Sequence, residues 1–282
     1  MSLKTVISAS RRTDIPAFYL GWFMQAIRQG HVEVANPLYP HQKRQVSLLP
    51  RDVAWIVFWS RNYTGVLKNR AFFEAYELFF HFTIVSHSRL FEPVRIPLDQ
   101  TLDQAEQLAS AFGPERIIWR YDPVIVWEKA GRIASNYQRN EFERICRALS
   151  ETGIRKCYFS FMTLYRKAVR RIRNADPEIR LGGIRSGKKL EILNDMRQIS
   201  GKYGVDLFGC SDDWLASHGV TRGSCISGER LNQLTDQGRV TAAKAPGRKA
   251  CCCTRSIDIG SYSEQPCPYG CLYCYANPVR RD

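Results

Sequence analysis

The sequence predicts an α/β fold: a parallel sheet arranged as a full or partial (β/α) barrel of about six units, followed by a cysteine-rich, metal-binding tail. Short apolar segments alternate with longer amphipathic segments through the first three quarters of the chain. Several of the short segments are largely apolar runs without alternation, as parallel strands covered on both faces are. Eight of the ten cysteines lie between Cys210 and Cys274, where the alternation has ended.

Six strands and five helices make up the alternation. The expected strands span 5–10, 53–59, 79–85, 116–121, 156–162 and 206–210. The expected helices span 17–28, 65–76, 98–112, 135–150 and 188–202. The clearest helix, 98–112, places its apolar residues on one face and polar residues elsewhere. Residues 30–52 interrupt the pattern and are predicted to form a small hairpin.

Two regions follow from this pattern. We expect a barrel-like catalytic domain over residues 1–210 and an iron–sulfur or other metal-binding tail over 211–282. The tail is rich in glycine, serine and cysteine and has little apolar periodicity of its own. We therefore expect metal ligation, together with packing on the mouth of the barrel, to hold it in place.

The composition is that of an ordinary globular protein, with 44% hydrophobic and 24% charged residues. The first ten residues lack the pattern of a signal peptide. The longest apolar run, 53–59, is too short to cross a bilayer. We therefore expect a cytoplasmic protein without a membrane partner. In that compartment cysteines are kept reduced, which favours metal ligation over disulfide bonds.

The chain carries a formal charge of +14, and much of the excess is local. Residues 155–202 contain thirteen basic and four acidic residues, including a basic segment over 165–173. One interpretation is contact with nucleic acid or with another anionic substrate. The other is a solvated charged face, which is the more common meaning of a charge run.

Three cysteines near the end of the chain have the spacing C-x3-C-x2-C: Cys267, Cys271 and Cys274. A closed zinc site or an ordinary cubane cluster takes four protein ligands. Three thiolates would therefore leave one iron of a 4Fe-4S cluster open to an outside ligand. The alternative is that they are three of the four ligands of a zinc ion.

When the terminal three cysteines and three others are set aside, a second group of four cysteines remains. Cys146 and Cys157 fall on apolar faces and are predicted to be core residues, and Cys252 is predicted to point away from its neighbours. The remaining four are Cys210, Cys225, Cys251 and Cys253. Four thiolates suit either a second 4Fe-4S cluster or a structural zinc site.

Charged residues lie at the carboxyl ends of the predicted strands or just after them, where chemistry gathers in parallel α/β barrels. These residues are Arg12, Asp14, Arg61, Arg120 and Asp122. As catalytic or substrate-contacting groups, the aspartates could accept protons or hold a ribose, and the arginines could bind carboxylate or phosphate. The alternative is that Arg12–Asp14 and Arg120–Asp122 are structural ion pairs.

The terminal segment Cys-Pro-Tyr-Gly-Cys-Leu-Tyr-Cys-Tyr-Ala, residues 267–276, resembles the cluster motif of radical S-adenosylmethionine enzymes, in particular their spore photoproduct lyase-like branch. The resemblance implies that Cys267, Cys271 and Cys274 hold a 4Fe-4S cluster and that Tyr273 packs near the adenine of S-adenosylmethionine. It also implies an electron donor such as a flavodoxin or ferredoxin. The nearest relatives by motif act on DNA.

The chain departs from that pattern in two ways. The three-cysteine motif comes last, whereas radical enzymes of this kind place it after the first strand. A permuted arrangement would still seat it beside the first strand, since the ends of a nearly closed barrel are neighbours. A Gly-Gly-Glu segment of the kind that binds the methionine amine does not occur in the expected position, so the methionine-binding residues are left unassigned.

A further resemblance covers nearly the whole chain. The segments 8–16, 58–62, 119–123 and 256–260, with the terminal motif, are similar to an uncharacterised bacterial family of unknown function. Two functional hypotheses follow. The first is a radical S-adenosylmethionine-type enzyme. The alternative is a non-catalytic nucleic-acid-binding protein with structural zinc or iron–sulfur sites.

Overall fold

An eight-stranded parallel sheet organises the chain in the computed structural model, which describes residues 3–36, 39, 41–182, 186–236, 239–246 and 250–279. In spatial order its strands are β11 (Thr221–Arg222), β10 (Asp206–Gly209), β9 (Lys156–Phe161), β6 (Ile117–Val124), β5 (Glu77–Thr83), β4 (Val53–Ser60), β1 (Thr5–Ala9) and β12 (Ile257–Asp258). Within the described residues, the two edge strands β11 and β12 do not pair with each other. The sheet is therefore open, and the expectation of a full barrel is wrong.

The six predicted strands are confirmed as β1, β4, β5, β6, β9 and β10. Each is apolar enough to be recognised on its own, and β4 is almost entirely buried. The sheet gains one short strand at each edge, β11 and β12, of two residues each. Strand β12 comes from the tail and pairs in parallel with β1, which places the tail beside the first strand of the chain.

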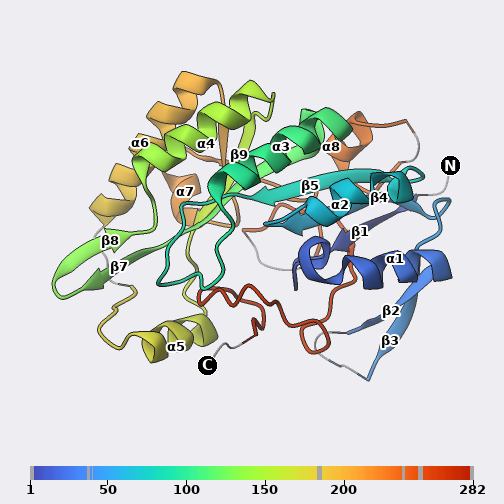
Figure 1. Ribbon diagram of the computed structural model, residues 1–282, viewed down its shortest axis with the longest axis horizontal. Coiled ribbons are helices and arrows are strands. Elements are labelled where there is room, and N and C mark those ends of the chain that lie inside the picture. Colours follow the sequence, from blue (N-terminus) through green and yellow to red (C-terminus); the bar gives the residue numbers. More distant parts are fainter. Residues whose placement is uncertain are drawn as a thin grey trace.

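Helices connect the strands. They are α1 (Leu20–Gln29), α2 (Thr64–Lys68), α3 (Leu98–Phe112), α4 (Arg139–Glu151), α5 (Arg166–Ala175), α6 (Ser186–Tyr203), α7 (Asp213–Ser217) and α8 (Gly228–Gln233). Figure 1 shows α3, α4 and α6 side by side along one side of the sheet, with α3 packed on α4 and α4 on α6. The basic segment forms α5, which lies next to the tail in the same view.

Two hairpins lie outside the main sheet. The predicted hairpin in 30–52 is confirmed as β2 (His31–Ala35) and β3 (Lys43–Ser47). A second hairpin, β7 (Val126–Lys129) and β8 (Arg132–Ser135), occupies the start of the helix expected over 135–150, so α4 begins later than expected. Between β7 and β8 the two turn residues both have positive φ, as a tight two-residue hairpin turn requires.

The helix expected over 65–76 is shorter in the structure than predicted. It ends at Lys68, and a 3-10 turn follows at Arg70–Phe73. Asn69 lies between the two segments, where its side-chain amide donates to the Gly65 carbonyl (2.8 Å). Asparagine favours such local bonds to the backbone over continuing a helix, which explains the early end.

Each face of the sheet is covered by a different part of the chain. Alternate residues of β4 show this division, since Ile56 and Phe58 pack toward the helices whereas Trp55 and Val57 face the other way. On that second face the covering residues come from the tail and include Ile226, Leu231 and Val240. The tail therefore packs its apolar side chains against this second face, which is the inner face of the open sheet.

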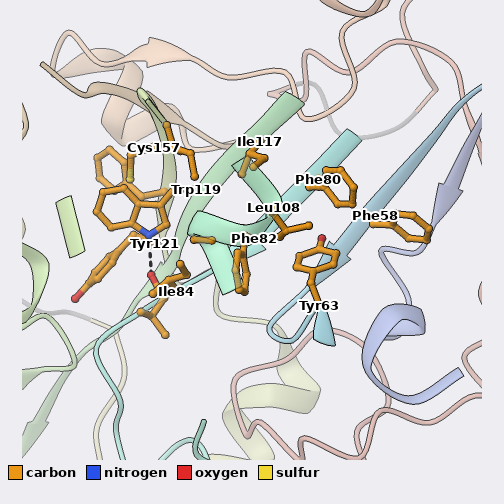
Figure 2. Close-up of a cluster of buried hydrophobic side chains, with 14 of the residues drawn as sticks. Phe58, Tyr63, Phe80, Phe82, Ile84, Leu108, Ile117, Trp119, Tyr121 and Cys157 are labelled. Carbon is orange, nitrogen blue, oxygen red and sulfur yellow. Dashed lines mark hydrogen bonds between the residues drawn. The ribbon is translucent and has the colours of Figure 1, made fainter. Parts of the chain in front are cut away.

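The core between sheet and helices is rich in aromatic residues (Figure 2). Trp119 is fully enclosed there, and its indole N–H donates to the Ile84 carbonyl (2.8 Å), so its one polar atom is paired. Cys157 lies in the same cluster and Cys146 is also fully buried, which confirms both as core residues.

None of the helices in the described ranges is both long enough and apolar enough to cross a membrane.

Candidate functional site

A cavity of about 300 Å³ opens at the carboxyl ends of the strands. Its walls come from the ends of β1, β4, β6, β9 and β10 and from the tail. Every charged, tyrosine and cysteine residue that the sequence singled out for a site lines it. They are Arg12, Asp14, Arg61, Arg120, Asp122, Cys210, Cys225, Cys251, Cys253, Cys267, Cys271, Tyr273 and Cys274. The structure thus brings together residues that are up to about 260 positions apart in sequence, while their chemical roles stay predictions.

Asp14 lies at one wall of the cavity, just after β1. Its carboxylate accepts hydrogen bonds from the Ser60 hydroxyl (2.7 Å), the Arg61 N–H (3.0 Å) and the Ala17 N–H (3.0 Å). Burial raises the pKa of Asp14 to about 6 in spite of these bonds. The carboxyl group is therefore able to take up or release a proton near neutral pH.

The Arg12–Asp14 ion pair, the structural alternative for these two residues, does not form. Arg12 instead lies 3.8 Å from Asp258 of β12 and donates to the Gly260 carbonyl (2.9 Å). Arg120 and Asp122 do pair, in agreement with the structural alternative for those two residues. The register of β12 beside β1 explains the difference, since it places Asp258 next to the end of β1.

Asp258 joins the tail to the first strand. It accepts hydrogen bonds from the hydroxyls of Ser8 (2.7 Å) and Ser10 (2.5 Å) and from the Arg11 N–H (2.9 Å). A side chain at Gly260 would collide with Ser10, so the two segments lie in close contact there. This contact fixes the tail against the wall of the cavity.

The terminal cysteines lie against a second charged group. Arg61 donates to the sulfur of Cys271 (3.6 Å) and pairs with Glu92 (2.7 Å). Glu92 also accepts from the Tyr273 hydroxyl (2.6 Å) and lies 3.5 Å from His87. Burial would raise the pKa of Glu92, but the Arg61 charge and the bonds from His87 and Tyr273 lower it to about 2.

Sequence reasoning missed Glu92 and Asp258. Glu92 lies in a polar stretch, 86–92, that directly follows the predicted strand 79–85. The same rule that selected residues at other strand ends would have selected this stretch as well. Asp258 lies inside one of the segments used for the family resemblance, but its two-residue strand is too short to recognise from apolar pattern.

The three terminal thiols share the cavity and are held by backbone contacts. The Cys274 N–H donates to the Cys271 carbonyl (3.2 Å), and the Cys267 N–H to the Asn277 carbonyl (3.3 Å). From α5, Arg171 donates to the carbonyls of Leu272 and Cys274. Burial raises the pKa of Cys267 to about 12 and that of Cys274 to about 11.

The second cysteine group lies across the cavity. The sulfurs of Cys210 and Cys225 are 3.5 Å apart, and the Cys253 thiol interacts with those of Cys225 and Cys251. A hydrogen bond from Cys253 lowers the pKa of Cys251 to about 6. Cys252 is exposed and does not line the cavity, as predicted.

Among the residues that the structure describes, no group of three or more His, Cys, Asp or Glu side chains is arranged as a ready set of metal ligands. The thiols of the second group form a chain of neighbours rather than a shell around one point. Metal binding by either cysteine group therefore stays a prediction.

The fold and the cavity define an α/β protein with an open parallel sheet and a thiol-rich site at the carboxyl ends of its strands. Residues 6–276 match the family described as Domain of unknown function (DUF1848), so the chain belongs to that family. This confirms the resemblance to a family of unknown function. No curated protein matches the chain.

Proposed function

We propose that this protein is a radical S-adenosylmethionine-type enzyme in which Cys267, Cys271 and Cys274 hold a 4Fe-4S cluster. The observation that carries the proposal is that all three thiols line one cavity at the carboxyl ends of a parallel sheet. Cys271 is buried, and Cys267 and Cys274 are half-buried. Burial, and to a smaller extent the charge on Cys271, raises the pKa of Cys267 and of Cys274. A metal centre would relieve that repulsion by binding the thiolates.

The position of the tail supports the permuted arrangement that would reconcile the late motif with the radical-enzyme pattern. Strand β12 precedes the three-cysteine motif and lies at the sheet edge next to β1. The strand that precedes the motif in sequence is therefore the direct spatial neighbour of the first strand of the chain. The Tyr19 hydroxyl donates to the Pro266 carbonyl (2.7 Å), which ties the start of the motif to the segment after β1.

By this resemblance, a cluster held by the three cysteines would supply the electron for reductive cleavage of S-adenosylmethionine. The proposed part of the chain's own side chains is to bind and orient the cofactor and the substrate. Arg61 donates to Cys271 and is held in place by Glu92, which also fixes the Tyr273 hydroxyl. The bond to Glu92 supports the role that the resemblance gives Tyr273, which is to pack against an adenine ring. Asp14, with a pKa of about 6, is the group best suited to accept a proton from a bound substrate.

Anaerobic reconstitution with iron and sulfide tests the proposal. After reduction, by dithionite or by a flavodoxin or ferredoxin donor, the protein is expected to convert S-adenosylmethionine to 5′-deoxyadenosine, measured by chromatography. Cys271→Ala is expected to lose the nucleoside product, whereas the matched Cys252→Ala keeps it. A fully loaded protein that forms no nucleoside would overturn the proposal, as would equal loss in both variants.

The proposal includes an anionic substrate, with nucleic acid as the first class to test. Helix α5 supports it in part: Arg166, Arg170 and Arg173 are exposed on it, whereas Arg171 contacts the tail. Binding to duplex DNA is expected to weaken steeply with salt, and Arg166→Ala/Arg170→Ala/Arg173→Ala is expected to reduce the log–log slope by about 0.9 per lost phosphate contact. Arg51→Ala, exposed at the opposite ends of the strands, is the control. A slope near zero in the unaltered protein would remove nucleic acid as the substrate class.

A further inference from the structure

We propose that Cys210, Cys225, Cys251 and Cys253 bind a single zinc-type divalent cation in a closed four-thiolate site, separate from the site of Cys267, Cys271 and Cys274. The four cysteines come from three segments: the end of β10, the connection that precedes α8, and the tail before β12. The inference does not depend on the proposed function, because it concerns other ligands and another kind of metal centre.

The spacing of the sulfurs favours one ion over a cubane cluster. In a tetrahedral site with Zn–S bonds of about 2.3 Å, two sulfurs lie roughly 3.8 Å apart. The sulfurs of Cys210 and Cys225 are 3.5 Å apart, close to that edge. The Cys253 thiol contacts Cys225 on one side and Cys251 on the other. In a cubane the cysteine sulfurs bind four different irons and lie farther apart.

The side chain of Arg120 gives a second, independent reason to expect a metal ion at these cysteines. Its guanidinium is buried and donates to the sulfurs of Cys225 (3.0 Å) and Cys210 (3.6 Å) while it pairs with Asp122. A neutral thiol is a weak acceptor and a metal-bound thiolate is a strong one, so a buried guanidinium aimed at both sulfurs is complementary to a thiolate–metal site. A zinc ion with four thiolates carries a net charge of about −2, which the guanidinium partly neutralises.

With four thiolate ligands the ion would have no open coordination position for a substrate, so its effect would be on the stability of the fold. Cys225 and Cys253 are buried, and the backbone around them is already joined, since the Thr254 N–H donates to the Ile226 carbonyl (2.8 Å). The Cys210 N–H donates to the Phe159 carbonyl (2.8 Å), which fixes that ligand to the sheet. An ion bound here would cross-link the tail to β10 and stabilise the covering of the inner sheet face.

Closure of the shell requires the side chains to turn toward a common point. Contacts between thiols depend on their protons, and a cation replaces those protons with bonds from sulfur to metal. Each of these thiols already contacts the next one, so rotation about the Cα–Cβ bonds is a small change. The exposed Cys252, between Cys251 and Cys253, is left outside.

The test uses the full chain with Cys267, Cys271 and Cys274 replaced by alanine, so that the terminal site is absent. About one zinc ion per chain is expected by metal analysis. Exchange for cobalt is expected to give intense thiolate-to-cobalt charge-transfer absorption and the visible bands of tetrahedral cobalt. Adding Cys225→Ala is expected to reduce the bound zinc at least tenfold, whereas adding Cys252→Ala leaves it unchanged.

A second measurement does not depend on the folding of the Cys225 variant. In the parent triple variant, bound zinc is expected to protect Cys210, Cys225, Cys251 and Cys253 from alkylation while Cys252 reacts, as read by peptide mass spectrometry. If metal analysis finds iron and sulfide in place of zinc, the proposal of a single-ion site is overturned. Less than a tenth of a metal ion per chain, or equal alkylation of all five cysteines, would overturn it as well. None of these results bears on 5′-deoxyadenosine formation by the unaltered protein.

Discussion

Replacing Asp258 with alanine is expected to lower the free energy of unfolding by about 3–5 kcal/mol, because it removes the carboxylate that joins β12 to β1. That carboxylate accepts from Ser8, Ser10 and the Arg11 backbone, and its side chain is 7% exposed. Both serines are fully buried, so their hydroxyls would lose their acceptor without access to water. Arg11 and Arg12 would lose a nearby counter-charge as well.

Denaturant unfolding of the purified protein, at unchanged metal content, measures this effect. Asp99→Ala is the matched control, because Asp99 also pairs with an arginine, Arg144, but its side chain is 75% exposed. Surface pairs contribute about 0–1 kcal/mol, so the control should lie within that range. Equal effects in the two variants would contradict the role given to Asp258.

The strands were predictable where burial is continuous. Strand β4 is apolar at almost every position, since both of its faces are covered, and such a run is visible in sequence alone. The edge strands β11 and β12 were not predictable, because two residues carry no period. Whether a sheet of this kind closes depends on the pairing of its edges, and those edges are the two unpredicted strands.

The gathering of the site residues was predictable from one topological rule. Parallel strands bring their carboxyl ends to one edge, so residues at or near the ends of β1, β4 and β6 had to be neighbours. Their partners were not predictable. Arg12 lies closer to Asp258 than to Asp14 because the register of β12 decides it, and register across 250 residues is absent from local sequence.

The Glu92 side chain is 1% exposed and pairs with Arg61. Glu92→Gln is expected to lower the free energy of unfolding by about 3–5 kcal/mol at pH 7, because it leaves the Arg61 guanidinium buried without its charge partner. Glutamine keeps the shape and one acceptor oxygen, so the effect reports the charge. Glu106→Gln, on the exposed face of α3, is the control and should change little.

The pH dependence separates this effect from a general loss of packing. The folded pKa of Glu92, about 2, lies below its ordinary value of 4.5, so the ionised carboxylate favours the fold above pH 4.5. That contribution is lost as the pH falls from 4.5 toward 2. Between pH 7 and pH 3 the gap between the unaltered protein and Glu92→Gln should therefore narrow by about 2 kcal/mol. Unfolding measured at both pH values tests this, and a gap of equal size at the two would show that the carboxylate's charge does not stabilise the site.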